Sequence, residues 1–303
     1  MGHPQHVEHP HTHTHSPTGT DADADADAAA MAELLDLDAE VLHAPLSQVI
    51  SWVRERTADR PPRRVLDLGA GTGTGTLALL SGFDDAEAVA VDASAEFLHH
   101  LQAAATARGL GDRVRTVHAD LDVAWPAPEA PEGSFDLVWA SSSLHHLGDP
   151  DRVLGEVLAA LRPGGLLVAV ELGGFPRFLP DDAGVGRPGL EDRAHDALAP
   201  AHTDRVPLLG ADWNPRLAAA GFTVEAERPL EVHLTPPLPP SAGRYAQATL
   251  RRVRSALDGR MAADDLAALD ALLDDDGPVA LRRRTDLTVR TTRTVWTASR
   301  PPR

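Results

Sequence analysis

Four glycines alternate with small residues just after an apolar stretch that carries an acid, at Gly69, Gly71, Gly73 and Gly75. The apolar residues before them and the helical apolar pattern after them predict a buried strand, a tight turn and a helix. Because glycine has no Cβ, such a turn lets a ligand approach the backbone closely, and the first N–H groups of the helix face that ligand. The sequence therefore predicts a ligand site at this turn.

Two common nucleotide-binding turns do not fit this pattern. A dinucleotide fingerprint, G-x-G-x-x-G/A, needs a small third residue where Thr74 stands. A P-loop needs a lysine after its last glycine, and the chain contains no lysine.

Asp92 ends the next predicted strand, 19 residues after Gly73. At that separation a Rossmann-type acid reaches a pair of ribose hydroxyls.

The pattern Asp67-x-Gly69-x-Gly71-x-Gly73 resembles motif I of the class I S-adenosylmethionine (SAM) dependent methyltransferases. Residues 144–147 (Leu-His-His-Leu) and 161–165 (Leu-Arg-Pro-Gly-Gly) resemble small-molecule members of that family. The similar part, residues 65–171, covers about a third of the chain and keeps the family's order of elements. The Asn/Asp-Pro-Pro-Tyr turn of many amide and amino N-methyltransferases is missing, which disfavours that branch.

The resemblance implies SAM as cofactor and S-adenosylhomocysteine as product. It implies that Asp67 orders the turn and positions the methionine part of SAM, that Asp92 binds the ribose, and that Asp120 approaches the adenine. A capping role at the surface is the alternative for Asp120. The cofactor residues expected from the resemblance are Asp67, Gly69, Ala70, Gly71, Thr72, Gly73, Asp92, Ala93, Asp120, Leu121 and Ala140.

Two adjacent histidines and one acid are candidates for proton transfer. His145 and His146 follow the fourth predicted strand, and Glu171 ends the fifth. Ligands of open α/β sheets bind beyond the carboxyl ends of the strands, so these positions face one crevice. Similar O-methyltransferases use a histidine here to take the hydroxyl proton, and histidine suits this task near neutral pH. We expect His145 as base, His146 as second candidate and Glu171 as orienting acid. Alternatively, both histidines are structural loop residues.

The acceptor is expected to contact residues outside the similar part. Arg177, Phe178, Arg244 and Tyr245 lie in two insertions, and aromatic and arginine side chains can clamp a ring or an acidic group. Ordinary surface and lid packing is the alternative explanation for these four residues.

The resemblance implies an α/β fold with a Rossmann-like doubly wound sheet, mostly parallel with one antiparallel strand. Residues 1–30, rich in histidine and Asp-Ala repeats, are expected to be a disordered tail, although alternating histidines can also bind metal. Helices before the core and in the insertions are expected to form a lid. The expected organisation is a helical lid at 31–60, a SAM-binding core at 61–235 with an insertion at 173–211, a helical pair at 236–286, and a last strand with the C-terminus at 287–303.

Composition excludes several classes of function. Without cysteine there is no iron–sulfur radical chemistry, thiol nucleophile or Cys-ligated zinc, and without lysine there is no Schiff-base chemistry. The net charge of −17 argues against nucleic acid as a partner. No apolar run approaches the ~20 residues that cross a bilayer, and there is no apolar signal segment. We therefore expect a cytoplasmic protein without a membrane partner.

Together these features predict transfer of a methyl group from SAM to a small-molecule acceptor, in the first place a hydroxyl oxygen, by in-line displacement with a histidine base. A SAM-binding relative that does not transfer methyl groups is the main alternative. A metal-delivery or interaction protein that acts through its histidine-rich tail is a third hypothesis.

Overall fold

The computed structural model describes residues 21–302, with side chains from residue 26 onwards. Within these residues one seven-stranded sheet has the order β3-β2-β1-β4-β5-β7-β6. Strand β7 runs antiparallel to both of its neighbours, and the other pairs are parallel, which confirms the predicted Rossmann-like sheet. The strands are β1 (Arg64–Leu68), β2 (Glu87–Asp92), β3 (Val114–His118), β4 (Phe135–Ser141), β5 (Leu161–Leu172), β6 (Thr223–Leu234) and β7 (Val289–Ser299).

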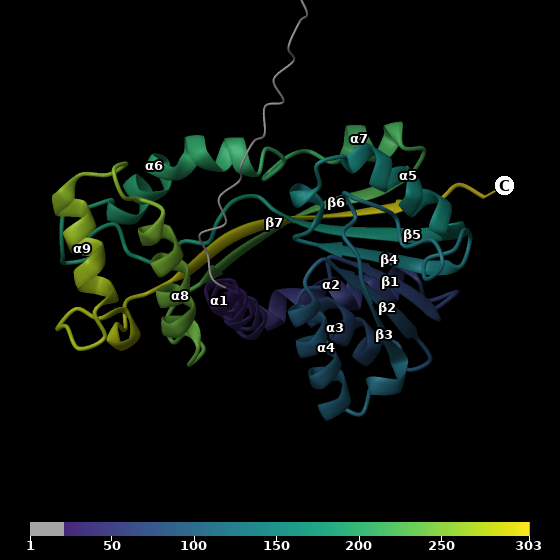
Figure 1. Cartoon of the computed structure of the whole chain (residues 1–303), viewed down its shortest axis with the longest axis horizontal. Helices are drawn as coiled ribbons and strands as arrows, with labels where there is room; N and C mark the ends of the chain where they lie inside the picture. Colours follow the sequence, from purple (N-terminus) through teal and green to yellow (C-terminus); the bar gives the residue numbers. More distant parts are fainter. Residues whose placement is uncertain (1–20, 303) are drawn as a thin grey trace, which may run out of the picture.

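Helices cover both faces of the sheet, because the central strands are apolar on both sides (Figure 1). One apolar core joins the sheet to α2 (His43–Arg56), α3 (Thr74–Gly82) and α4 (Ala95–Ala107). A second core on the opposite face joins it to α5 (Pro150–Ala160) and α7 (Asn214–Ala219).

A third apolar core lies beyond the end of the parallel strands and is built largely from the insertions. It unites α1 (Asp21–Val41), α6 (Leu190–Arg205), α8 (Ala242–Ser255) and α9 (Ala263–Leu273) with the beginning of β7. Figure 1 shows these helices grouped around the long β6–β7 ribbon, with α1 next to α8. None of the helices between residues 21 and 302 is both long and apolar enough to span a membrane.

The structure differs from the expected boundaries at two places. Helix α1 begins at Asp21, so residues 21–30 are helical rather than part of a disordered tail. Alanine is the best helix former, and aspartates near a helix N-terminus interact favourably with its dipole. The insertion at 173–211, for which no helix bounds were predicted, contains the 16-residue helix α6 with Pro200 inside it. Leu190, Ala194 and Leu198 bury one face of this helix. The histidines at 3–15 lie outside the described residues.

The turn between β1 and α3, residues 69–75, is called the glycine turn below. Gly73 has a φ of +92°, and a Cβ there would lie 2.1 Å from Cδ1 of Leu101 on α4. At Gly75 a Cβ would lie 2.4 Å from Nε1 of Trp139. The turn is therefore packed against α4 and β4, and glycine is needed for both its conformation and its fit.

We predict that Gly73→Ala destabilises the protein by about 2–5 kcal/mol. Left-handed backbone costs a non-glycine residue about 1–2 kcal/mol, and overpacking adds about 1–3 kcal/mol. The matched control is Gly109→Ala, because Gly109 has a φ of +69° but no atom within 4 Å of the added Cβ. Urea unfolding of the full chain should show a clearly larger loss for the first variant. Equal losses would contradict the tight packing of the turn.

Candidate active site

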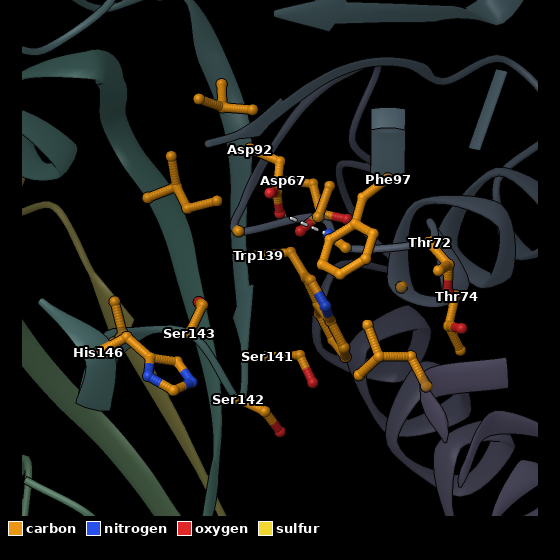
Figure 2. Close-up of a pocket in the computed structure, with 18 of the residues that line it drawn as sticks. Asp67, Thr72, Thr74, Asp92, Phe97, Trp139, Ser141, Ser142, Ser143 and His146 are labelled. Carbon is orange, nitrogen blue, oxygen red and sulfur yellow. Dashed lines mark hydrogen bonds between the residues drawn. The ribbon is translucent and has the colours of Figure 1, made fainter. Parts of the chain in front are cut away.

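A cavity of about 510 Å³ lies at the carboxyl edge of the parallel strands. Its wall combines the glycine turn with residues at the ends of β1, β2 and β4, while α1, α2 and Arg293 of β7 close the opposite side. Figure 2 shows Asp67, Asp92 and Phe97 on the side of the glycine turn, with His146 across from them and Trp139 between. The volume is typical of pockets that enclose a small organic ligand.

Asp92 holds the glycine turn in place. Its Oδ2 accepts a hydrogen bond from Gly71 N–H at 2.8 Å, and its Oδ1 accepts one from Ser94 N–H at 2.8 Å. Each carboxylate oxygen has two lone pairs, so both oxygens can accept a further hydrogen bond. Because Asp92 also lines the cavity, this carboxylate is fixed by the protein and still able to bind a pair of ligand hydroxyls.

Asp67 lines the same cavity but is only 2% exposed. Thr76 Oγ1 donates a hydrogen bond to its Oδ2 at 2.5 Å. The pKa of Asp67 is raised to about 7, chiefly by burial; the Thr76 hydrogen bond opposes this shift, and the charge of nearby Asp92 contributes to it. A buried carboxylate without a cationic partner favours a ligand that brings a positive charge.

Most of the remaining expected cofactor residues line the cavity, and two do not. Ala93, Asp120 and Leu121 are in its wall, whereas Gly73 and Ala140 are not. Gly73 faces Leu101, and Ala140 is fully buried in β4. The other expected residues in the wall are Gly69, Ala70, Gly71 and Thr72. Asp120 also caps the local backbone, as the alternative interpretation of this residue expects. Its Oδ1 accepts a hydrogen bond from Asp122 N–H at 2.9 Å.

Glu171 and His145 form a buried pair behind the cavity. Nδ1 of His145 donates a hydrogen bond to Oε2 of Glu171, and both side chains are at most 4% exposed. Oε1 of Glu171 accepts hydrogen bonds from Ser143 N–H at 3.1 Å and Leu144 N–H at 2.8 Å. Glu171, which we expected to orient a histidine, therefore contacts His145. It also fixes the loop after β4.

His146, not His145, lines the cavity. Its ring lies 4.2 Å from that of His145, centroid to centroid, and it is more exposed than the buried His145. Partial burial lowers the pKa of His146, the neighbouring His145 lowers it further, and Glu171 opposes the shift. These effects favour the neutral form of the imidazole on the cavity wall, which is the form that accepts a proton.

A family model described as a methyltransferase domain matches residues 65–165, which include the glycine turn, Asp92 and both histidines. These residues form a methyltransferase domain of the class I SAM-dependent type. The match ends before the insertions that build the third core.

Named relatives agree with the methyltransferase assignment, and a solved structure shares the fold. Demethylmenaquinone methyltransferase of Thermus thermophilus is 36% identical over 126 residues, covering 40% of this chain and 54% of that protein. The 27-O-demethylrifamycin SV methyltransferase of Amycolatopsis mediterranei is 32% identical over 167 residues, covering 51% and 58%. The chain thus spans somewhat more than half the length of each of these two relatives. The YcgJ protein of Bacillus subtilis shares the fold, with a TM-score of 0.52 at 18% identity over 86% of this chain and 100% of that one.

The methyltransferase cavity fits SAM by its own chemistry. The glycine turn leaves room for the cofactor, Asp92 presents acceptors for ribose hydroxyls, and Asp67 presents a carboxylate to a cationic group. Nε1 of Trp139 is buried and has no hydrogen-bond partner among the described residues, although the side chain lines the cavity.

The four residues expected to bind the acceptor do not line the cavity. Phe178 is fully buried and packs edge-on against Tyr245 at 5.0 Å between ring centroids, both within the third core. Arg177 lies beside Asp192, and Arg244 pairs with Glu33 of α1. This prediction is corrected because the aromatic residues build the core of the inserted helices, and Arg244 anchors α1 from outside.

Sequence reasoning missed the side chains that close the cavity. Met31, Leu35 and Asp38 come from α1, Phe97 comes from α4, and Arg293 comes from β7. The only signal in the sequence was the helical spacing of apolar residues after position 31, which predicted a helix over the cofactor site but not which of its polar residues faces inward.

We predict that Asp67→Asn stabilises the protein without ligand at pH 8. The raised pKa of Asp67 means that stability falls as pH rises from about 4 to about 7, since only the folded state keeps the proton there. A shift of this size corresponds to something on the order of 4 kcal/mol at most. Urea unfolding at pH 4 and pH 8 should show a gain for the variant that is present only at the higher pH.

Asp265→Asn is a control of opposite sign. Hydrogen bonds from Arg193 and then Arg187 lower the pKa of Asp265 to about 2, so its contribution is present above the ordinary aspartate pKa and is lost as pH falls towards 2. This variant should be less stable than the wild type at pH 8. If Asp67→Asn also loses stability at pH 8, the carboxylate of Asp67 is compensated in the folded protein and our interpretation is wrong.

Proposed function

We propose that the chain transfers the methyl group of SAM to a hydroxyl oxygen of a small molecule, with His146 as the general base. One observation carries this proposal. A histidine with a lowered pKa lines the same cavity as the glycine turn, and a buried acid–histidine pair fixes the loop that presents it. The name of the Amycolatopsis relative, a 27-O-demethylrifamycin SV methyltransferase, supports an oxygen acceptor.

The residues of the chain have three tasks in such a reaction. When bound, SAM supplies an electrophilic sulfonium methyl group. Asp92 and the glycine turn hold SAM. Helices α1 and α2 cover the cavity and exclude water from it. Neutral His146 accepts the proton of the acceptor hydroxyl.

We prefer His146 to His145 as the base, and two observations support this choice. Nδ1 of His145 is engaged by Glu171, and its ring is buried away from the cavity. We assign His145 and Glu171 a positioning role, because together they hold the loop after β4 and place the adjacent imidazole on the cavity wall.

We predict that His146→Ala lowers kcat by about 10²–10⁴, the usual effect of losing a general base. Affinity for S-adenosylhomocysteine, measured by calorimetry, should stay within a factor of two or three of the wild type, about 0.5 kcal/mol. The acceptor can be found by incubating cell extract with the full chain and methyl-labelled SAM and identifying the labelled product by mass spectrometry. The control is His99→Ala, a histidine on the exposed side of α4 that does not line the cavity.

The pH profile tests the same assignment. Because the pKa of His146 lies below its ordinary value of 6.5, kcat should be constant around neutral pH and fall only when the medium is more acidic. If His146→Ala keeps a near-native kcat on the true acceptor, positioning of the reactants alone drives the methyl transfer. Absence of S-adenosylhomocysteine binding to the wild type would contradict the proposed function as a whole.

A further inference from the structure

Among the described residues, Arg293 is the only arginine that lines the cavity. The wall otherwise carries five carboxylates, those of Asp38, Asp67, Asp92, Asp120 and Asp122. The side chain of Arg293 is 16% exposed, and its buried Nε has no hydrogen-bond partner among the described residues. A half-satisfied guanidinium in a binding cavity is a ready site for an anionic group.

The position of Arg293 in the sheet separates it from the cofactor residues. It pairs with Leu172 at the carboxyl end of β5, three strands from β1 in the order β1-β4-β5-β7. At the usual spacing of strands this places its backbone about 14 Å from the strand that leads into the glycine turn. His146 belongs to the loop after β4, between these two regions. The arginine therefore faces the part of the cavity beyond the base.

Asp38 of α1 occupies only part of the guanidinium. Both of its carboxylate oxygens lie 2.7 Å from Nη2 of Arg293, and Tyr245 Oη donates to Oδ1 at 2.6 Å. A guanidinium has five N–H donors, so a contact through one nitrogen leaves others for a second acceptor.

The cavity also has apolar walls. Met31 of α1, Leu42 before α2, and Leu144 and Leu147 of the loop after β4 line it, while Leu35 of α1 lies towards the glycine turn, 3.4 Å from a Cβ built on Gly71. A ligand that fits both features has an apolar body and one anionic group.

Building on the proposed function, we propose that the methyl acceptor is an apolar carboxylic acid whose carboxylate binds Arg293 while its hydroxyl faces His146. The methyl group goes to the hydroxyl, and the carboxylate serves only for recognition. The carboxylate adds to, or takes the place of, Asp38 at the guanidinium.

Binding of octanoate to the complex with S-adenosylhomocysteine tests this proposal, with octanol and octylamine as probes of the same apolar length. Octanoate should bind the wild type more tightly than either analogue. Arg293→Gln should weaken octanoate about ten- to a hundredfold, the worth of a charged hydrogen bond, and leave octanol unchanged. The matched control is Arg244→Gln, which removes another arginine partner of α1 outside the cavity and should not alter octanoate binding.

Asp38→Asn provides an independent variant if Arg293→Gln fails to fold. It removes the competing carboxylate, so octanoate should bind more tightly than to the wild type. Octanoate binding that is absent from the wild type, or equal in wild type and Arg293→Gln, would overturn the proposal. So would a loss of S-adenosylhomocysteine affinity in Arg293→Gln without a loss of 5′-methylthioadenosine affinity, because the arginine would then bind the amino acid part of the cofactor. These experiments measure binding alone. A failure of the proposed methyl transfer would appear in the turnover assays and not in these binding measurements.

Discussion

The carboxylate of Glu171 connects the two halves of the site. It ends β5, is 2% exposed, and accepts hydrogen bonds from the backbone of Ser143 and Leu144 and from His145. A buried carboxylate is tolerated only where such donors replace its lost hydration. The loop after β4 therefore takes its course from the neighbouring strand. His146 reaches the cavity because the residue before it is held in the interior.

The sequence predicted the parts of the structure that follow from local pattern and parallel topology. The glycines after β1 and the acids that end β2 and β5 lie at the same edge of the sheet because the carboxyl ends of parallel strands share one edge. The choice between His145 and His146 did not follow in the same way. Two adjacent residues have the same position in the topology, and only side-chain packing decides which of them Glu171 binds.

Contacts between distant segments limited the prediction of the rest of the site. Asp38 and Arg293 meet across 255 residues, and neither lies in a recognisable motif. Phe178 and Tyr245 were expected in a ligand site because aromatic side chains suit it, but the same side chains also suit a core. Here they pack together in the third core, which the inserted helices need because the sheet offers them no free face.

Helix α1 is held over the cavity by charges that reach three different elements, α8, α4 and β7. The pairs are Glu33–Arg244, Asp36–His100 and Asp38–Arg293. The first two are about half exposed, and the second is an ion pair only when His100 is protonated. Dissolved ions screen exposed ion pairs over a distance of about 8 Å at physiological ionic strength. Because the same helix forms a wall of the cavity, the ionic strength of the surroundings should influence how often that wall opens, and thus how fast ligands enter and leave.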